Sequence, residues 1–169
     1  SQEELCTLYL KEVEKQIEGF SQDGIKFAGL IFCSLFANEG LPDFPKDYLT
    51  KVSKLVRDSG GVLILDEVQA GFGRTGTWWG YQLSNVSPDI AVMGKPMGSG
   101  LPVSGVIATE EISNTFHEKA FYFNTTAATP LQAAVAGTVI DIIQDEGLIE
   151  NAEKIGGYLK TELLKIKDD

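Results

Sequence analysis

Two residues of opposite charge stand where buried segments of this chain are expected to end. Asp66 closes the apolar run VLILD, and Lys95 follows the apolar run IAVMG. Lys95 lies in GKPMGSG, whose three glycines and one proline fix the backbone and allow close approach to it. A surface lysine needs no such loop. The pair favours either a simple ion pair or chemistry that uses a reactive amine.

An amine and a carboxylate at neighbouring strand ends suit pyridoxal phosphate. The aldehyde of this cofactor forms a Schiff base with a lysine amine, while an acid partner keeps the pyridine nitrogen protonated. The protonated ring then accepts the electrons released when a bond at the substrate's α-carbon breaks. We therefore predict that Lys95 and Asp66 are catalytic, and the simple ion pair remains the alternative interpretation.

The stretch GFGRTG, from Gly71 to Gly76, matches the G-x-G-x-x-G pattern of dinucleotide-binding turns. That turn needs its first glycine at the end of a strand and a helix that starts within the motif. Here the strand is expected to end at Asp66, and the following TWWGYQ does not resemble the start of a helix. The context also lacks the other kinase signatures, and GKPMGSG does not match a P-loop. The pattern therefore does not predict a nucleotide site.

The elements around these residues alternate between apolar runs and amphipathic segments. Strands are expected within residues 24–33, 62–66, 87–95 and 102–111, and helices within 5–17, 41–61, 129–147 and 148–166. Gly19 is expected to stop the first helix, while Thr129 and Pro130 cap and open the third. Strands in which apolar and polar residues do not alternate are typical of parallel sheets that are buried on both faces. We predict an α/β fold with a three-layer, largely parallel open sheet and helices on both faces.

Composition limits the classes of function. The 169 residues suit one domain, are 43% hydrophobic and carry a formal net charge of −10. That charge argues against nucleic acid or an anionic membrane as the main partner. The two cysteines form no C-x-x-C motif and the single histidine has no companion, so neither a disulfide framework nor a metal site is expected. No signal peptide or membrane span is recognisable, which favours a cytoplasmic location.

Three stretches carry a family resemblance. LILDEVQAGFGRTG, SPDIAVMGKPMGSGLPVSGVIAT and YFNTTAATPLQAAVAGTVIDIIQDEGLIENA together resemble the core of class III (ω-type) aminotransferases. The residues in these stretches are most similar to the branch that contains alanine–glyoxylate aminotransferases and ethanolamine-phosphate phospho-lyases. The resemblance implies the large domain of the fold-type I pyridoxal-phosphate transferases and a homodimeric enzyme.

The resemblance also implies roles for individual residues. Lys95 would form the Schiff base and move the α-proton, and Asp66 would hold the pyridine nitrogen. Val68 would pack on the cofactor ring, and Gln69 would hydrogen-bond near its phenolic oxygen. Thr125 would bind the phosphate of the cofactor in the neighbouring subunit, although the adjacent Thr126 leaves the register of that role open.

Where the family has a glycine pair after the phosphate-binding threonine, this chain has Ala127 and Ala128. Alanine tolerates fewer backbone conformations than glycine, so we expect this loop to be shaped differently. The chain is also much shorter than class III enzymes and is expected to be a central fragment of one. Residues 1–148 would belong to the cofactor-binding domain, and 149–169 would be the first helix leading into a small domain. The upstream loop that cups the cofactor phosphate is then outside the chain.

Three functions remain open at this point. The first is transfer of an amino group from an amine or ω-amino acid to a keto acid. The second is a phospho-lyase acting on a phosphorylated amino alcohol or amino acid. The third is a fragment without catalytic activity. The residues that select the amino donor are expected largely outside this chain.

Overall fold

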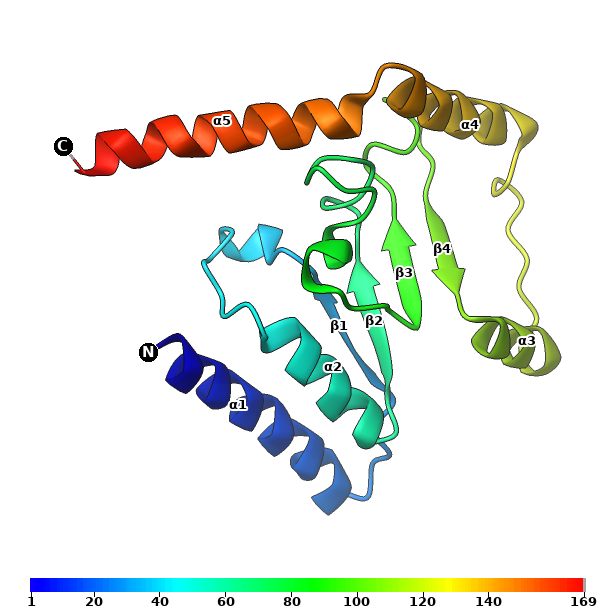
Figure 1. The fold of residues 1–169 in the computed structure, drawn as a ribbon. Coiled ribbons are helices and arrows are strands. Elements are labelled where there is room, and N and C mark those ends of the chain that lie inside the picture. The colour runs from blue at the N-terminus through cyan, green and yellow to red at the C-terminus, as the bar shows by residue number, and fades with distance from the viewer. Residues whose placement is uncertain (169) are drawn as a thin grey trace.

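A computed structural model describes residues 1–168 and shows one four-stranded sheet with five α-helices around it (Figure 1). In chain order the elements are α1 (Gln2–Gln22), β1 (Gly29–Cys33), η1 (Ala37–Glu39), α2 (Tyr48–Asp58), β2 (Val62–Asp66), η2 (Gly80–Ser84), β3 (Ile90–Met93), β4 (Gly105–Ala108), α3 (Glu110–Lys119), α4 (Pro130–Asp145) and α5 (Leu148–Asp168). The prediction of an α/β fold is confirmed.

The strands lie side by side in the order β1-β2-β3-β4. The first three run parallel, and β4 pairs antiparallel with β3. Only a loop joins β3 to β4, and a parallel return needs a longer crossover, usually through a helix, so the chain comes back in the opposite direction. The sheet is therefore largely parallel, as predicted, and its fourth strand lies antiparallel at one edge.

Helix α2 covers one face of the sheet and forms the main core with β2. Leu63 and Leu65 alternate with less buried neighbours along β2 and pack against Leu49 of α2 and Val86. All four side chains are at most 6% exposed. The other face, with Ile90 and Val92, turns toward residues of α3 and α4. Helix α2 therefore packs on one face, and α3 and α4 border the hollow over the other face.

Two details of the helices differ from the sequence predictions. Helix α1 continues through Gly19 to Gln22, because one interior glycine costs a helix only about 1 kcal/mol and the backbone first becomes left-handed at Gly24, with φ +72°. Helix α3 was not predicted at all. Its sequence EEISNTFHEK is mostly polar, has no buried residue and offers little helical periodicity to recognise.

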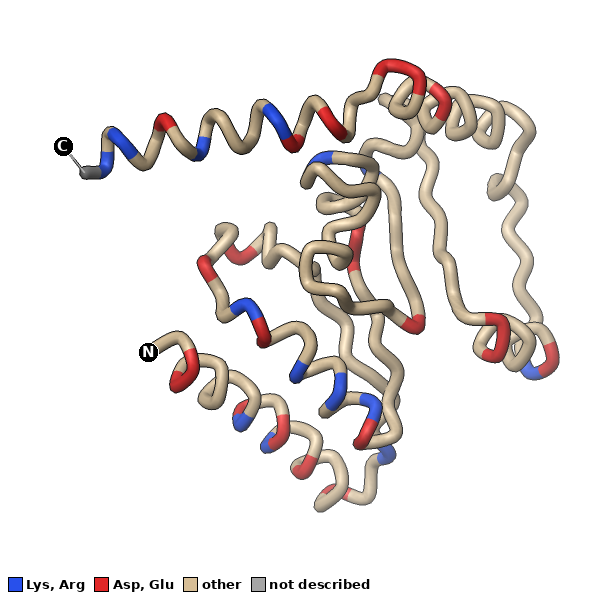
Figure 2. The backbone as a smooth tube through the Cα atoms, in the orientation of Figure 1, with Lys and Arg blue, Asp and Glu red and all other residues tan. Residues whose placement is uncertain are grey.

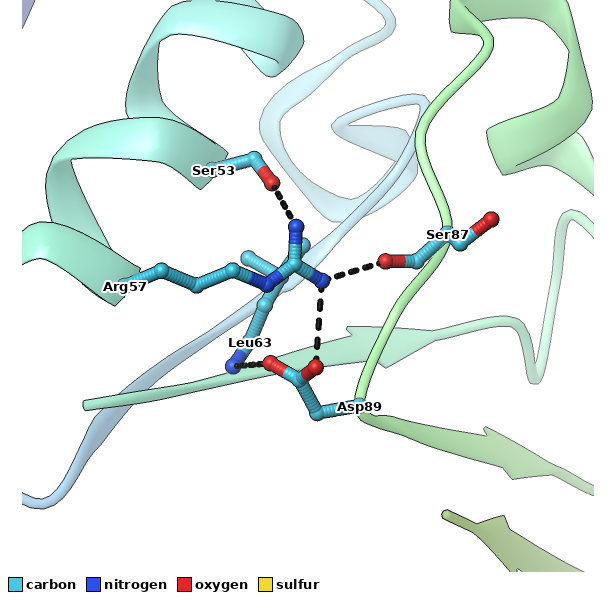
Figure 3. A network of polar contacts seen from close by, with 5 residues as sticks. All are labelled: Ser53, Arg57, Leu63, Ser87 and Asp89. Atoms are coloured by element: carbon cyan, nitrogen blue, oxygen red, sulfur yellow. Dashed lines mark hydrogen bonds and ion pairs between the residues drawn. The ribbon is translucent and has the colours of Figure 1, made fainter. Parts of the chain in front are cut away.

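A polar network joins α2 to the N-terminal end of β2 and to the segment that precedes β3 (Figure 3). Arg57 of α2 donates hydrogen bonds to Ser53 Oγ at 2.9 Å, to the Ser87 carbonyl at 2.5 Å and to Asp89 Oδ1 at 3.1 Å. The second carboxylate oxygen of Asp89 accepts the Leu63 backbone N–H at 2.7 Å. Asp89 therefore joins α2, β2 and the segment that leads into β3.

Charge is distributed unevenly over the elements (Figure 2). Helices α1, α2 and α5 carry half of the charged residues, whereas residues 120–140 carry none. Helix α4 begins as predicted, with Thr129 accepting a hydrogen bond from the Gln132 N–H and Pro130 in the first turn. None of the described helices combines the length and the apolarity that a membrane crossing requires.

Candidate active site

The parallel register brings Asp66 and Lys95 to one edge of the sheet. Asp66 is the last residue of β2 and pairs with Val92 of β3, and Lys95 lies just beyond the end of β3. Lys95 Nζ donates a hydrogen bond to Gln69 Oε1 at 2.9 Å, and the Val68 N–H donates to Asp66 Oδ1 at 2.9 Å. Four of the five predicted site residues therefore lie at the carboxyl ends of two adjacent strands.

The ion-pair interpretation does not hold for the described residues, since neither Asp66 nor Lys95 takes part in a salt bridge. The amine of Lys95 is exposed and bound to a neutral amide oxygen. Lys95 is also the only charged residue in positions 90–109. The site therefore offers one exposed amine without a carboxylate that neutralises it directly.

A broad hollow of about 1290 Å³ opens beside Lys95. Val68 forms part of its wall, in agreement with a residue that packs on a flat ring, and strands β3 and β4 form its floor. Its polar lining includes Ser104, Asn124 and Thr126, which the sequence analysis had not placed in the site, except for Thr126 as a shifted alternative. These hydroxyl and amide side chains lie far from one another in the sequence and form no recognisable motif, so the sequence alone could not identify them.

The loop that carries Thr125 lies on the far side of this hollow. Thr125 is exposed and is not among the lining residues, whereas Asn124 and Thr126 are. Asn124 Oδ1 accepts hydrogen bonds from the Thr126 N–H at 3.0 Å and from Thr126 Oγ1 at 3.1 Å. Within one chain, the structure brings the position of Thr126 into the hollow and leaves Thr125 facing outward.

Ala128 ends this loop with φ +54°, in the left-handed region that favours glycine. The sequence predicted that alanine would reshape the loop. In this structure the alanine takes a conformation that costs little for glycine and about 1–2 kcal/mol for an alanine. Ala128 therefore forms a left-handed turn just before α4 begins.

The glycine loop Gly71–Gly76 serves the packing of α5. Gly73 has φ +84°, and a Cβ there would lie 2.9 Å from Cγ1 of Ile149; Gly76 has φ +80°, and its Cβ would lie 2.9 Å from Cβ of Glu153. Both contact residues belong to the first turns of α5. The two glycines therefore allow the first turns of α5 to pack closely on this loop. This geometry agrees with the prediction that GFGRTG is not a nucleotide-binding turn.

The side chains around the glycine loop are structural. Trp78 and Trp79 pack against the cluster of Phe72, Met93 and Ile143, as expected for residues that stabilise the fold. Arg74 forms no salt bridge within residues 1–168 and donates a hydrogen bond to the Gln69 carbonyl at 3.0 Å. Arg74 therefore links the glycine loop to the residue that holds Lys95.

Comparison with known proteins places this geometry in a family. The aminotransferase class-III family model matches residues 1–169. The chain is 37% identical over 158 residues to human mitochondrial alanine–glyoxylate aminotransferase 2, covering 93% of this chain. It is 43% identical over 122 residues to ethanolamine-phosphate phospho-lyase homolog 1 of Caenorhabditis elegans, covering 70% of this chain and 26% of the relative.

A solved structure extends the similarity to the fold. A phospholyase from Arthrobacter in complex with phosphoethanolamine superposes with a TM-score of 0.91 at 38% identity, over 95% of this chain and 38% of that protein. The chain spans 29% of the length of the human relative. The match of the family model over the whole sequence shows that the chain belongs to the class III aminotransferases.

Proposed function

We propose that this chain supplies the part of a class III active site that binds the reactive end of pyridoxal phosphate. The observation that carries the proposal is the hydrogen bond of 2.9 Å from Nζ of Lys95, which lines a hollow of about 1290 Å³, to Gln69 Oε1, with Asp66 at the end of the adjacent strand. An exposed amine and a carboxylate on adjacent strand ends are the groups that hold the aldehyde and the ring nitrogen of this cofactor.

Each residue has a distinct part in this proposal. Lys95 would hold the aldehyde end of the cofactor through Nζ, and the same amine would move a proton at the α-carbon of the substrate. Asp66 keeps a proton on the ring nitrogen, since an anionic partner at short range favours the charged form. Val68 forms a wall against the ring, and Gln69 donates or accepts hydrogen bonds at the ring oxygen. The bound cofactor supplies an electron sink.

The residues fit the ring end of the cofactor better than its phosphate end. Lys95 is the only lysine or arginine among the residues that line the hollow, so phosphate would have to bind hydroxyls and amides such as those of Thr126 and Asn124. We propose that Thr125, which faces outward, binds the phosphate held by a second copy in a homodimer. The exposed aromatic side chains beside this loop, Phe121, Tyr122 and Phe123, support contact with a second copy.

For the complete enzyme we propose transfer of an amino group from an amine or ω-amino acid to a keto acid. The similarity to human alanine–glyoxylate aminotransferase 2 over 93% of the chain supports this reaction. The second candidate is a phospho-lyase, favoured by 38% identity to the Arthrobacter phospholyase that binds phosphoethanolamine. Free phosphate and ammonia from phosphoethanolamine would identify the lyase, and an amino acid formed from a keto acid would identify the transferase.

The test is an absorbance spectrum of the folded chain with pyridoxal phosphate, followed by borohydride reduction. We expect a visible band that free cofactor does not give, fixed to the peptide that contains Lys95. Lys95→Ala should abolish it, and Lys119→Ala, which removes an exposed lysine of α3, should retain it. A folded wild-type chain that captures no cofactor would contradict the proposal.

A further inference from the structure

Glu67 is a fully buried carboxylate next to Asp66, and the proposed chemistry does not use it. Its side chain is 0% exposed. Three donors converge on it: Ser34 Oγ at 2.6 Å and the Tyr81 N–H at 3.1 Å reach Oε1, and the Gly80 N–H reaches Oε2 at 2.7 Å. Each of the two oxygens accepts a backbone N–H, and Oε1 also accepts the Ser34 hydroxyl, so both oxygens of Glu67 act as acceptors in this pocket.

These contacts close the loop that carries Val68 and Gln69, two of the five candidate site residues. Residues 67–81 leave the end of β2, pass through Val68, Gln69 and the glycine loop, and return at the start of η2. Glu67 stands at the first position of this loop, and its side chain binds the backbone of the last two. Its carboxylate therefore clamps the two ends of the loop together and fixes both to the residue that follows β1, Ser34.

The clamp is tightly packed and leaves no room for adjustment. A Cβ at Gly80 would lie 2.6 Å from Ser34 Oγ and 2.7 Å from Cβ of Ala70. The Glu67 backbone is fixed as well, because its N–H donates to the Val92 carbonyl at 2.8 Å and its carbonyl accepts the Gly71 N–H at 2.9 Å. The residue thus connects β3, the glycine loop, η2 and the end of β1.

The clamp lies two residues from the group that holds Lys95. Gln69 accepts the hydrogen bond from Lys95 Nζ, and its carbonyl accepts one from Arg74 within the same loop. The position of Gln69 therefore depends on how the loop is closed. Glu67 does not line the hollow and has no exposed surface, so it cannot touch a ligand and is not a catalytic residue.

We propose that Glu67 is a positioning residue for Lys95, acting through the closed loop 67–81 and the side chain of Gln69. The inference rests on the proposed function, in which Lys95 binds the cofactor. In Glu67→Gln the amide nitrogen would face the Gly80 N–H, so one donor would oppose another and the loop would open at that end. In Ser34→Ala only one of the three hydrogen bonds is lost, and the effect on Lys95 is smaller.

The first experiment needs no cofactor. The lysines of the chain are labelled with a trace of acetic anhydride, and the rate at Lys95 is divided by the rate at Lys119, an exposed lysine of α3 that lies outside both α2 and loop 67–81. Loss of the Gln69 contact should raise this ratio about two- to tenfold in Glu67→Gln, the range that corresponds to one hydrogen bond of ordinary net strength. Ser34→Ala should raise it less.

The matched control is Val56→Ala, which removes buried atoms from α2 at a site that is also 0% exposed. It lowers stability without touching the loop and should leave the labelling ratio unchanged. An unchanged ratio in Glu67→Gln, or an equal rise in Val56→Ala, would overturn the positioning role. If Glu67→Gln does not fold, Ser34→Ala decides the question by the same ratio.

The second experiment measures capture of pyridoxal phosphate at Lys95 in the same variants. We expect the apparent affinity to fall in Glu67→Gln by a factor similar to the rise in labelling, and to stay at the wild-type value in Val56→Ala. If the wild-type chain captures no cofactor, the proposed function fails, whereas the labelling ratio still reports whether Glu67 positions Lys95. The two proposals can therefore fail separately.

Discussion

The two loops that carry candidate cofactor residues are built in opposite ways. In loop 67–81 Glu67 is 0% exposed and Phe72 only 7%, whereas Phe121 and Phe123, which lead into the loop of Thr125, are 94% and 74% exposed. The first loop is held by a buried carboxylate and an aromatic cluster, and the second by a few exposed hydrogen bonds. The chain therefore fixes the ring end of the proposed site by itself, and the phosphate end is supported much less.

Truncation of one aromatic side chain in each loop should show the largest contrast. Phe72→Ala removes a buried ring that packs against Met93 and Ile143 and should cost about 3–5 kcal/mol of unfolding free energy. Phe123→Ala removes a ring that is 74% exposed and should change it by less than about 0.5 kcal/mol. Urea unfolding followed by circular dichroism measures both. Similar losses in the two variants would contradict the comparison.

Gly76→Ala should be the next largest effect, because it combines backbone strain with a steric clash. The position has φ +80°, and the new Cβ would meet Cβ of Glu153 at 2.9 Å. Together these should cost about 2–4 kcal/mol.

The control for this effect is Gly100→Ala, with φ +106° and nothing within 4 Å. It carries the strain alone and should cost about 1–2 kcal/mol. Thermal unfolding of both variants separates the two contributions, and equal shifts in Tm would mean that α5 does not press on the glycine loop.

These two loops also show what a sequence can predict. The apolar runs and their order predicted the parallel strands, and hence that Asp66 and Lys95 would share one edge. The seat that Gly73 and Gly76 provide for α5 depends on a contact between distant segments, which local pattern does not encode. The same holds for the three donors around Glu67, since Ser34 and Gly80 lie far from it in sequence.

The Glu67 clamp should give stability a characteristic dependence on pH. Burial raises the pKa of Glu67 above its ordinary value of 4.5, although the three hydrogen bonds oppose the shift. The folded chain then holds this proton more tightly than the unfolded chain. The contribution of Glu67 to stability is therefore fully present below pH 4.5 and is lost as the pH rises through the folded pKa.

Glu67→Gln should cost about 1–3 kcal/mol, because it leaves a buried donor unpaired. This cost should be larger near pH 4.5 than at pH 8, where the wild type has lost the contribution of its raised pKa. Urea unfolding across this range measures the difference, and Val56→Ala should show a difference that does not vary with pH. A cost that grows as the pH rises would contradict the direction assigned to Glu67.

Ala128→Gly should have the smallest effect and the opposite sign. With φ +54°, the alanine has a strained backbone at the end of the exposed loop, and glycine relieves the strain but makes the unfolded chain more flexible. The balance should be a gain of about 0.5–1 kcal/mol, measured by urea unfolding.

The matched control is Gly137→Ala inside α4, where no atom lies within 4 Å of the new Cβ and the helix gains a better former. If Ala128→Gly lowered the stability while Gly137→Ala raised it, this would contradict the backbone strain assigned to Ala128 before α4. A gain in stability in both variants would assign the backbone strain of the loop of Thr125 to Ala128. The difference between the loops would then lie in how their ends are anchored, because loop 67–81 depends on glycine where a helix presses on it, and the loop of Thr125 has an alanine where glycine would be easier.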